Sequence, residues 1–334
     1  MPSSFCIPAL ILAGLVGTDP LLAQPLDCSN RKLVVQVVDR KGALVRDLVQ
    51  SDFAASYDGH PLTLASVQPH HGSGRVVLLL DKSGSMGYKL GNFNADLPPT
   101  PSEEMVLEEF LASLPPGVPL ALIFFGETIE SKTGFGETRE KLHQLASHEF
   151  RDSKKWKGHT ALWDAIFEAA LLLDKAQMGD SIVLVSDGAD NYSIRQPREV
   201  TNILLDQGIR LFAFIPLSTH PASAGIVTHI PKEVSGPGDL IQAADETGGS
   251  AAVHELADLG WKSNRLLVAR DAGSIFWRFL TGYEVGIAVP KAWQKPQKWR
   301  LQIKDDIKTR KKIDRVEYPA RLMPCPRLAE AGGR

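Results

Sequence analysis

Four continuous apolar runs constrain the fold of this chain most strongly. They are Arg75–Leu80 (RVVLLL), Leu120–Phe125 (LALIFF), Ser181–Val185 (SIVLV) and Arg210–Ile215 (RLFAFI). Runs of this kind are typical of strands buried on both faces, as in a parallel sheet that helices cover. Between and after them, helical patterns occupy Ser102–Leu114, Ala161–Ala176, Pro197–Gln207 and Asp239–Thr247. The alternation predicts a doubly wound α/β domain with a mostly parallel sheet.

Shorter β-type segments flank this domain on both sides. Before it, we expect strands at Lys32–Val38, Ala43–Val49, Phe53–Tyr57 and Leu62–Val67. After it, we expect strands at Tyr283–Val289, Trp299–Lys304 and Arg315–Tyr318, with the basic run Lys308–Lys312 at a hairpin tip. The polar stretch Gln68–Gly74 is expected to be a linker, with His70 and His71 in solvent.

Neither flank has enough strands to build a core of its own. We therefore predict that residues 24–72 and 283–326 pack together as a small all-β sandwich, with the α/β domain of residues 73–282 inserted between them. Residues 327–334 are expected to be a tail.

Composition excludes several classes of protein. Of the 334 residues, 43% are hydrophobic and 23% are charged, with a net charge of -2, as in ordinary globular proteins. A near-neutral chain gives no reason to expect a nucleic-acid-binding surface. Three cysteines are too few for a four-cysteine zinc site or a disulfide scaffold.

The N-terminus has the pattern of a secretory signal peptide over residues 1–23. The uncharged run Phe5–Val16 is too short to span a bilayer, and cleavage after Ala23 would leave a small residue at the cut. We expect export to the periplasm, the cell envelope or the medium, with no transmembrane segment in the mature chain. Removal of the signal peptide also removes Cys6, which leaves Cys28 and Cys325 to form one disulfide in an oxidising compartment.

Oxygen-bearing side chains follow two of the buried strands. Asp81, Ser83 and Ser85 come directly after the first strand, and Asp187 follows the strand that ends at Val185. Thr160 ends the GHT segment Gly158–Thr160, which opens the helix that follows. In an open parallel sheet ligands bind beyond the carboxyl ends of the strands, so these side chains are expected to converge there. Hard oxygen donors favour Mg²⁺, Mn²⁺ or Ca²⁺ over zinc or copper.

The order Asp81-x-Ser83-x-Ser85, then Thr160, then Asp187 resembles the metal-ion-dependent adhesion site (MIDAS) of von Willebrand factor type A (VWFA) domains. The words DKSGSM, HTALWDAI and SDGADN are also similar to motifs of that family, and the flanking segments resemble a bacterial subgroup of exported VWFA-related proteins. The chain departs from the pattern in having GHT before the helix and an insert at Gly87–Pro101. The insert could reshape the binding face.

The resemblance implies a Rossmann-like VWFA fold and a binding function without a reaction. In that family the serines and the threonine can contact the metal directly, whereas the two aspartates often act through water. An Asp or Glu carboxylate of a partner protein typically completes the metal's ligands. The resemblance therefore implies cation-dependent protein binding, in an adhesin, an assembly factor or a sensor.

Two other functions compete with this interpretation. A serine hydrolase would use Ser85 with Asp187 and His220 or His229, in the chain order of the α/β-hydrolases. Against it, no oxyanion-hole motif precedes the strand, and Asp81 would repel a developing oxyanion. A subunit of a chelatase or a secretion machine is the third possibility, and export argues against a cytoplasmic chelatase.

Overall fold

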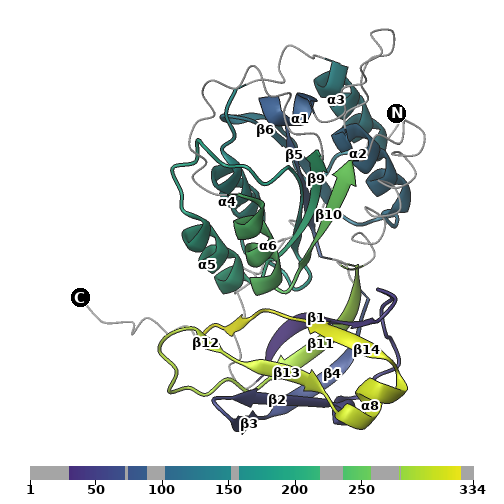
Figure 1. Cartoon of the computed structure of the whole chain (residues 1–334), viewed down its shortest axis with the longest axis vertical. Coiled ribbons are helices and arrows are strands. Elements are labelled where there is room, and N and C mark those ends of the chain that lie inside the picture. The colour runs from purple at the N-terminus through teal and green to yellow at the C-terminus, as the bar shows by residue number, and fades with distance from the viewer. Residues whose placement is uncertain are drawn as a thin grey trace, which may run out of the picture.

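A computed structural model describes residues 30–71, 74–88, 102–151, 158–218, 236–256, 278 and 280–324. The described chain forms an α/β body and a β body, stacked along the long axis of the molecule (Figure 1). Several expected features lie outside the described residues: the signal peptide, the pair Cys28 and Cys325, the tail at 327–334, His220 and His229, and residues 89–101 of the insert.

The α/β body is built on a six-stranded sheet in the order β10-β9-β8-β5-β6-β7. The strands are β5 (Val76–Asp81), β6 (Leu120–Phe125), β7 (Ile129–Lys132), β8 (Ser181–Val185), β9 (Arg210–Ser218) and β10 (Ser250–Leu256). All neighbours are parallel except β7, which runs antiparallel to β6. The chain leaves β5 toward β6 and later returns to its other side at β8, so the topological switch point lies between β5 and β8.

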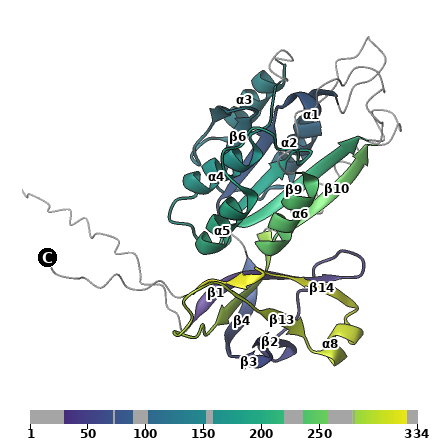
Figure 2. The same ribbon diagram turned by 60° about the vertical axis from the view of Figure 1, so that its left-hand side comes forward.

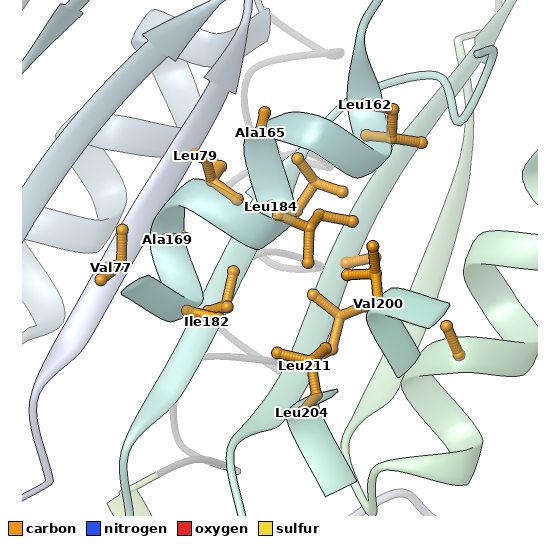
Figure 3. Packing of buried hydrophobic residues seen from close by; sticks show 14 of the residues in the cluster. Val77, Leu79, Leu162, Ala165, Ala169, Ile182, Leu184, Val200, Leu204 and Leu211 are labelled. Carbon is orange, nitrogen blue, oxygen red and sulfur yellow. The ribbon is translucent and has the colours of Figure 1, made fainter. Parts of the chain in front are cut away.

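Helices cover both faces of this sheet (Figure 1). They are α2 (Ser102–Ser113) and α3 (Arg139–Arg151) on one face, and α4 (Leu162–Leu172), α5 (Pro197–Gln207) and α6 (Pro237–Glu246) on the other. Alternate residues of each strand point to opposite faces. Val77 and Leu79 accordingly belong to the cluster under α4 and α5 (Figure 3), whereas Leu78 and Leu80 belong to the cluster on the side of α2. Both faces of β5 are therefore apolar, as its sequence predicts.

The β body joins segments from the two ends of the chain. Its largest sheet has the order β14-β1-β11-β4, in which β1 (Arg31–Asp39) lies between β11 (Thr281–Ile287) and β14 (Ile313–Glu317), and β4 is Leu64–His71. A second sheet contains β2 (Phe53–Tyr57), β3 (His60–Leu62) and β13 (Arg300–Ile303) in the order β13-β2-β3. A two-stranded pair, β12 (Gln297–Lys298) and β15 (Arg321–Leu322), completes the body. The predicted fold class is thereby confirmed.

The two bodies meet at the end of the α/β body that carries α5 and α6 (Figure 2). Arg321 donates to Asn202 on α5 at 2.9 Å and to Glu246 on α6 at 2.7 Å. Backbone contacts join the same elements, because the Ala320 amide donates to the Glu246 carbonyl at 2.8 Å and Thr247 forms an isolated bridge with Pro319. The strands β9 and β10 point away from the β body (Figure 1), and β5 and β8 run parallel to them, so the carboxyl ends of these strands lie at the end of the sheet away from the β body.

Two local expectations were wrong. Ala43–Val49 forms no strand beyond a single bridge between Leu44 and Val38. The Tyr283 hydroxyl donates to the Val45 carbonyl and accepts the Leu48 amide, both at 3.0 Å, and so satisfies backbone groups that a sheet would otherwise pair. The run at Lys308–Lys312 is not a hairpin tip but part of a helix and the turn after it, α8 (Asp305–Arg310). Acidic residues in the first turn of this helix and basic residues in its last turn interact favourably with the helix dipole.

The expected linker at Gln68–Gly74 was also wrong. Residues 68–71 continue β4, because β11 offers them a partner strand as far as His71. His70 is therefore buried and not solvated. Sequence patterns also missed β7, α3 and β10, as well as a short helix, α1 (Gly84–Tyr88), and a 3-10 turn, η1 (Gln50–Asp52).

Candidate metal centre

The candidate centre begins where β5 ends. Asp81 is fully buried, and its carboxylate accepts the Ser83 amide at 2.8 Å and the Ser186 hydroxyl at 2.6 Å. The first of these bonds closes an Asx turn, which reverses the chain directly after the strand. The hydroxyl oxygens of Ser83 and Ser85 then lie 3.2 Å apart. The turn thus brings the two predicted hydroxyl ligands together beside the first predicted carboxylate.

Asp187 adds a second carboxylate at this edge. It follows β8, the neighbour of β5, and its residue is 4% exposed. Burial and, after it, the charge of Asp187 raise the pKa of Asp81 to about 7, although hydrogen bonds from Ser186 and Ser83 oppose the shift. Because a like charge raises a carboxyl pKa only at close range, Asp81 and Asp187 form an electrostatically coupled pair. In the protein alone these two groups repel.

Thr160 stands on the third element of the centre. The Gly84 amide lies 3.5 Å from the Gly158 carbonyl, which places the turn before α4 against the turn after β5. Gly158 has a φ of +90° and a Cβ there would meet Glu127 Oε1 at 2.6 Å, so a glycine suits this turn. Thr160 itself is buried, and its amide donates to Asn191 Oδ1 at 2.9 Å.

A network of hydrogen bonds holds the loop after β8, and sequence reasoning missed most of it. The Thr160 carbonyl accepts the amides of Asn191 and Tyr192, each at 3.1 Å. Asp190 accepts the Leu162 amide at 3.0 Å and the Ser193 hydroxyl at 2.6 Å. These residues lie within or just after the SDGADN word, which was the signal available in the sequence. The network ties the loop of Asp187 to the start of α4.

Lys82 is the second feature that sequence reasoning missed. Its side chain is fully buried, and its Nζ lies 2.7 Å from Glu149 on α3 and 2.9 Å from Glu130 on β7. The sequence around Lys82 does not indicate its partners, because Glu130 and Glu149 are 48 and 67 positions away in the chain. Lys82 therefore anchors the turn of Asp81 to α3 and β7.

The residues present fit a hard divalent cation. Neighbouring oxygens around such an ion, at metal–oxygen distances of about 2.1 Å, lie about 3 Å apart, close to the spacing of the Ser83 and Ser85 hydroxyls. A cation also removes the repulsion between Asp81 and Asp187. The candidate ligands are two aspartates and three hydroxyl side chains, so they are not a cluster of titratable residues alone. Within the described ranges, no group of three or more His, Cys, Asp or Glu residues is placed to hold a metal.

The hydrolase alternative gains nothing from this geometry. Ser85 bonds to another serine hydroxyl, and the two histidines proposed for it are outside the described ranges. The buried Asp81 lies four residues before Ser85, and its negative charge would oppose a developing oxyanion at that serine.

The fold and this edge together define a doubly wound α/β domain with an oxygen-rich centre at its switch point. Residues 76–189 match the sequence profile of the von Willebrand factor type A domain. The α/β body of this chain is thus a von Willebrand factor type A domain, a class that typically mediates protein interactions.

Similar solved structures support no finer assignment. A von Willebrand factor type A protein from Catenulispora acidiphila is 14% identical, with 85% of this chain and 71% of that chain covered and a TM-score of 0.43. The conserved hypothetical protein BatB from Bacteroides thetaiotaomicron is 14% identical, with 60% and 98% covered and a TM-score of 0.39. An aerotolerance-related membrane protein from Bacteroides fragilis is 15% identical, with 60% and 98% covered and a TM-score of 0.38. Among curated proteins, no sequence matched this chain.

The search for membrane-spanning helices was negative. Across the part of the chain that the structure describes, every helix is too short or too polar to cross a bilayer.

Proposed function

We propose that this chain is an exported protein-binding module that captures its partner through a divalent cation. Asp81, Ser83, Ser85, Thr160 and Asp187 hold Mg²⁺, or Mn²⁺ or Ca²⁺ in its place. The observation that carries the proposal is the coupled pair of buried carboxylates beside two hydroxyls 3.2 Å apart.

The chemistry of this centre is binding and not catalysis. When bound, the cation offers a coordination position to an anionic oxygen of the partner, for which an Asp or Glu carboxylate is the natural ligand. The chain's own residues orient the site: Ser186 and the Ser83 amide fix the Asp81 carboxylate, and Asn191 fixes the backbone of Thr160. Lys82 anchors the turn after β5 through its ion pairs with Glu149 and Glu130.

Calorimetric titration of the full chain with Mg²⁺, Mn²⁺ and Ca²⁺ tests the proposal. We expect wild type to bind at least one ion and Asp81→Ala to bind none, because that variant keeps only one carboxylate in the centre. Glu168→Gln, at a partly exposed position on α4, is the control that should bind as wild type does. The proposal fails if wild type binds none of the three ions, or if Asp81→Ala binds as tightly as wild type.

Export is part of the proposal and has its own test. It rests on the apolar run Phe5–Val16 and on the small residue Ala23. N-terminal sequencing of protein recovered from the cell envelope or the medium should begin near Gln24. Recovery of the chain with Met1 intact and only in the cytoplasm would refute this part.

A further inference from the structure

Two large apolar side chains stand exposed in the loop beside the candidate metal centre. Ile194 is 90% exposed and Tyr192 is 51% exposed. The other large apolar residues exposed in the described ranges are dispersed along the chain, at Val49, Leu171, Met178 and Val253. Among the loops that the structure describes, only this one combines two such residues with the edge of the sheet that carries the candidate ligands.

The loop is built to keep Ile194 where it is. The carboxylate of Asp164 on α4 accepts the Ile194 amide at 2.9 Å and the Arg195 amide at 3.1 Å. The Ser193 hydroxyl accepts the Trp163 amide at 2.9 Å and donates to Asp190. Because backbone bonds from both sides hold the loop, the exposed side chain is not the tip of a free segment. Full burial of an isoleucine is favourable, so a surface that keeps one exposed by design is suited to contact a partner.

Tyr192 connects this apolar surface to the candidate ligands. Its amide donates to the carbonyl of Thr160, and its ring stacks on that of His159 with centroids 5.6 Å apart and planes 3° from parallel. His159 directly precedes Thr160 in the chain. We name His159, Tyr192 and Ile194 the apolar rim. The rim borders the candidate centre through the Thr160 backbone.

The charge next to the rim is compensated within the chain. Arg195 Nη1 lies 2.5 Å from Glu199, and the guanidinium carbon lies 3.4 Å from the centroid of the Phe167 ring. This cation is therefore engaged by Glu199 on α5 and by the Phe167 ring on α4. The rim consequently favours a neutral apolar group over a second acidic one.

We infer that the partner presents one Asp or Glu carboxylate with an aliphatic or aromatic side chain next to it, which packs on the apolar rim. This inference rests on the proposed function, because the carboxylate is the group that the cation would bind. The inference adds a requirement for a neighbouring apolar residue. The metal would then select a partner with a carboxylate, and the apolar rim would select among such partners by the side chain next to that carboxylate.

A displayed library of random linear peptides, selected on the immobilised full chain in Mg²⁺ and eluted with EDTA, tests the inference. We expect the selected peptides to carry Asp or Glu with an apolar residue within one or two positions. A synthetic peptide from that pool is then titrated against variants by fluorescence polarisation. Ile194→Asp and Tyr192→Ala should each weaken its binding by about tenfold or more.

Leu171→Asp is the matched control, since Leu171 is also about half exposed but lies at the far end of α4. It should bind the peptide within twofold of wild type. Calorimetric Mn²⁺ titration of every variant separates the two proposals, because the rim variants should bind the ion as wild type does.

The remaining outcomes count against the inference. The inference about the apolar rim is wrong if the selected peptides carry a carboxylate but show no apolar preference. It is also wrong if Ile194→Asp and Leu171→Asp weaken peptide binding equally. Neither result contradicts the proposed metal centre. A library that yields no EDTA-sensitive peptide overturns the rim as well, and the Mn²⁺ titration then shows whether the metal centre falls with it.

Discussion

The two edges of the six-stranded sheet treat buried carboxylates in opposite ways. At the edge where the strands begin, the buried Asp180 accepts the Arg75 amide at 2.7 Å, the Arg75 guanidinium at 2.6 Å and the Gln177 amide at 2.8 Å. At the edge where the strands end, Asp81 is equally buried, but the charged group that acts on its pKa is Asp187, which carries the same charge. Both sites are ordered and polar. The first carboxylate is paired with a cation of the chain itself, whereas the second stands where the proposed divalent cation would bind.

Asp180 and Asp81 are equally buried, so burial does not distinguish the structural carboxylate from the proposed metal ligand. The charge of their neighbours does. Lys82 makes the same point within the second edge. Its ammonium group follows Asp81 in the chain, yet it compensates Glu130 and Glu149 instead of the aspartate pair. Four tests can break or sharpen this contrast.

Asp180→Ala should have the largest effect. Removal of this buried carboxylate takes the anionic partner from the Arg75 guanidinium and the acceptor from two amides, which typically costs about 3–5 kcal/mol of unfolding free energy. Urea denaturation of wild type and variant, with EDTA and with Mg²⁺, measures the loss, and the loss should be the same in both. A loss that Mg²⁺ reverses would contradict a purely structural role for Asp180.

The pH dependence of the metal-free protein should show the raised pKa of Asp81. The pKa of Asp81 is raised from 3.8 to about 7 by folding, so the folded protein binds this proton more tightly than the unfolded chain does. Stability from this group is complete below pH 4 and is lost as pH rises through about 7. The loss is roughly 4 kcal/mol at most, from about 1.4 kcal/mol for each unit of pKa.

Asp81→Asn isolates this contribution from other titrating groups. In EDTA, the difference in unfolding free energy between wild type and Asp81→Asn should shift toward the variant between pH 5 and pH 8. Parallel pH profiles for the two proteins would show that the coupled pair does not exist in solution.

Added metal should stabilise the second edge by mass action. An ion that binds only the folded protein adds about 2.7 kcal/mol at a concentration one hundred times its Kd. We expect Asp81→Ala to abolish this increment, and Ser85→Ala and Thr160→Ala to reduce it less, because each removes one neutral oxygen. Thermal melts with Mg²⁺, Mn²⁺, Ca²⁺ or EDTA measure the increments. In EDTA, Asp81→Ala should be as stable as wild type or more so, in contrast to Asp180→Ala.

Arg321→Ala should have the smallest effect. Its pair with Glu246 is about one quarter exposed, and pairs of this kind contribute at most about 1 kcal/mol. Because the pair joins the two bodies at the end away from the candidate centre, the variant should keep the full metal increment in the same melts. A variant that loses the increment would show that the β body influences the metal site.

Local patterns predicted some elements well because their causes are local. Helix α5 occupies the expected range Pro197–Gln207, since proline stands in its first turn and Gly208, with a φ of 71°, ends it in the left-handed conformation. The central strand β5 was equally clear, because six buried residues in succession leave few alternatives. The five candidate ligands followed from it, since the ends of neighbouring parallel strands meet at one edge.

Elements whose backbone is satisfied by distant groups were not predictable in this way. The segment Ala43–Val49 has strand-like residues, yet the hydroxyl of Tyr283, more than 230 positions away, binds its backbone. Strand β7 is short and alternates between half-buried and exposed residues, and it exists as a strand because β6 offers an edge. No local pattern contains these partners.

The apolar strand runs and the order of Asp, Ser, Thr and Asp residues were therefore enough to specify the class of domain and the edge at which its candidate ligands gather. The packed chain alone decided how charge is distributed there. In the packed chain the Lys82 ammonium pairs with Glu130 and Glu149. Burial beside Asp187 raises the pKa of Asp81. The Asp164 carboxylate binds the backbone of Ile194, whose side chain stays exposed. The physical reason is that burial and Coulomb interactions depend on distances in space, which residues far apart in the chain acquire only when the sheet has formed.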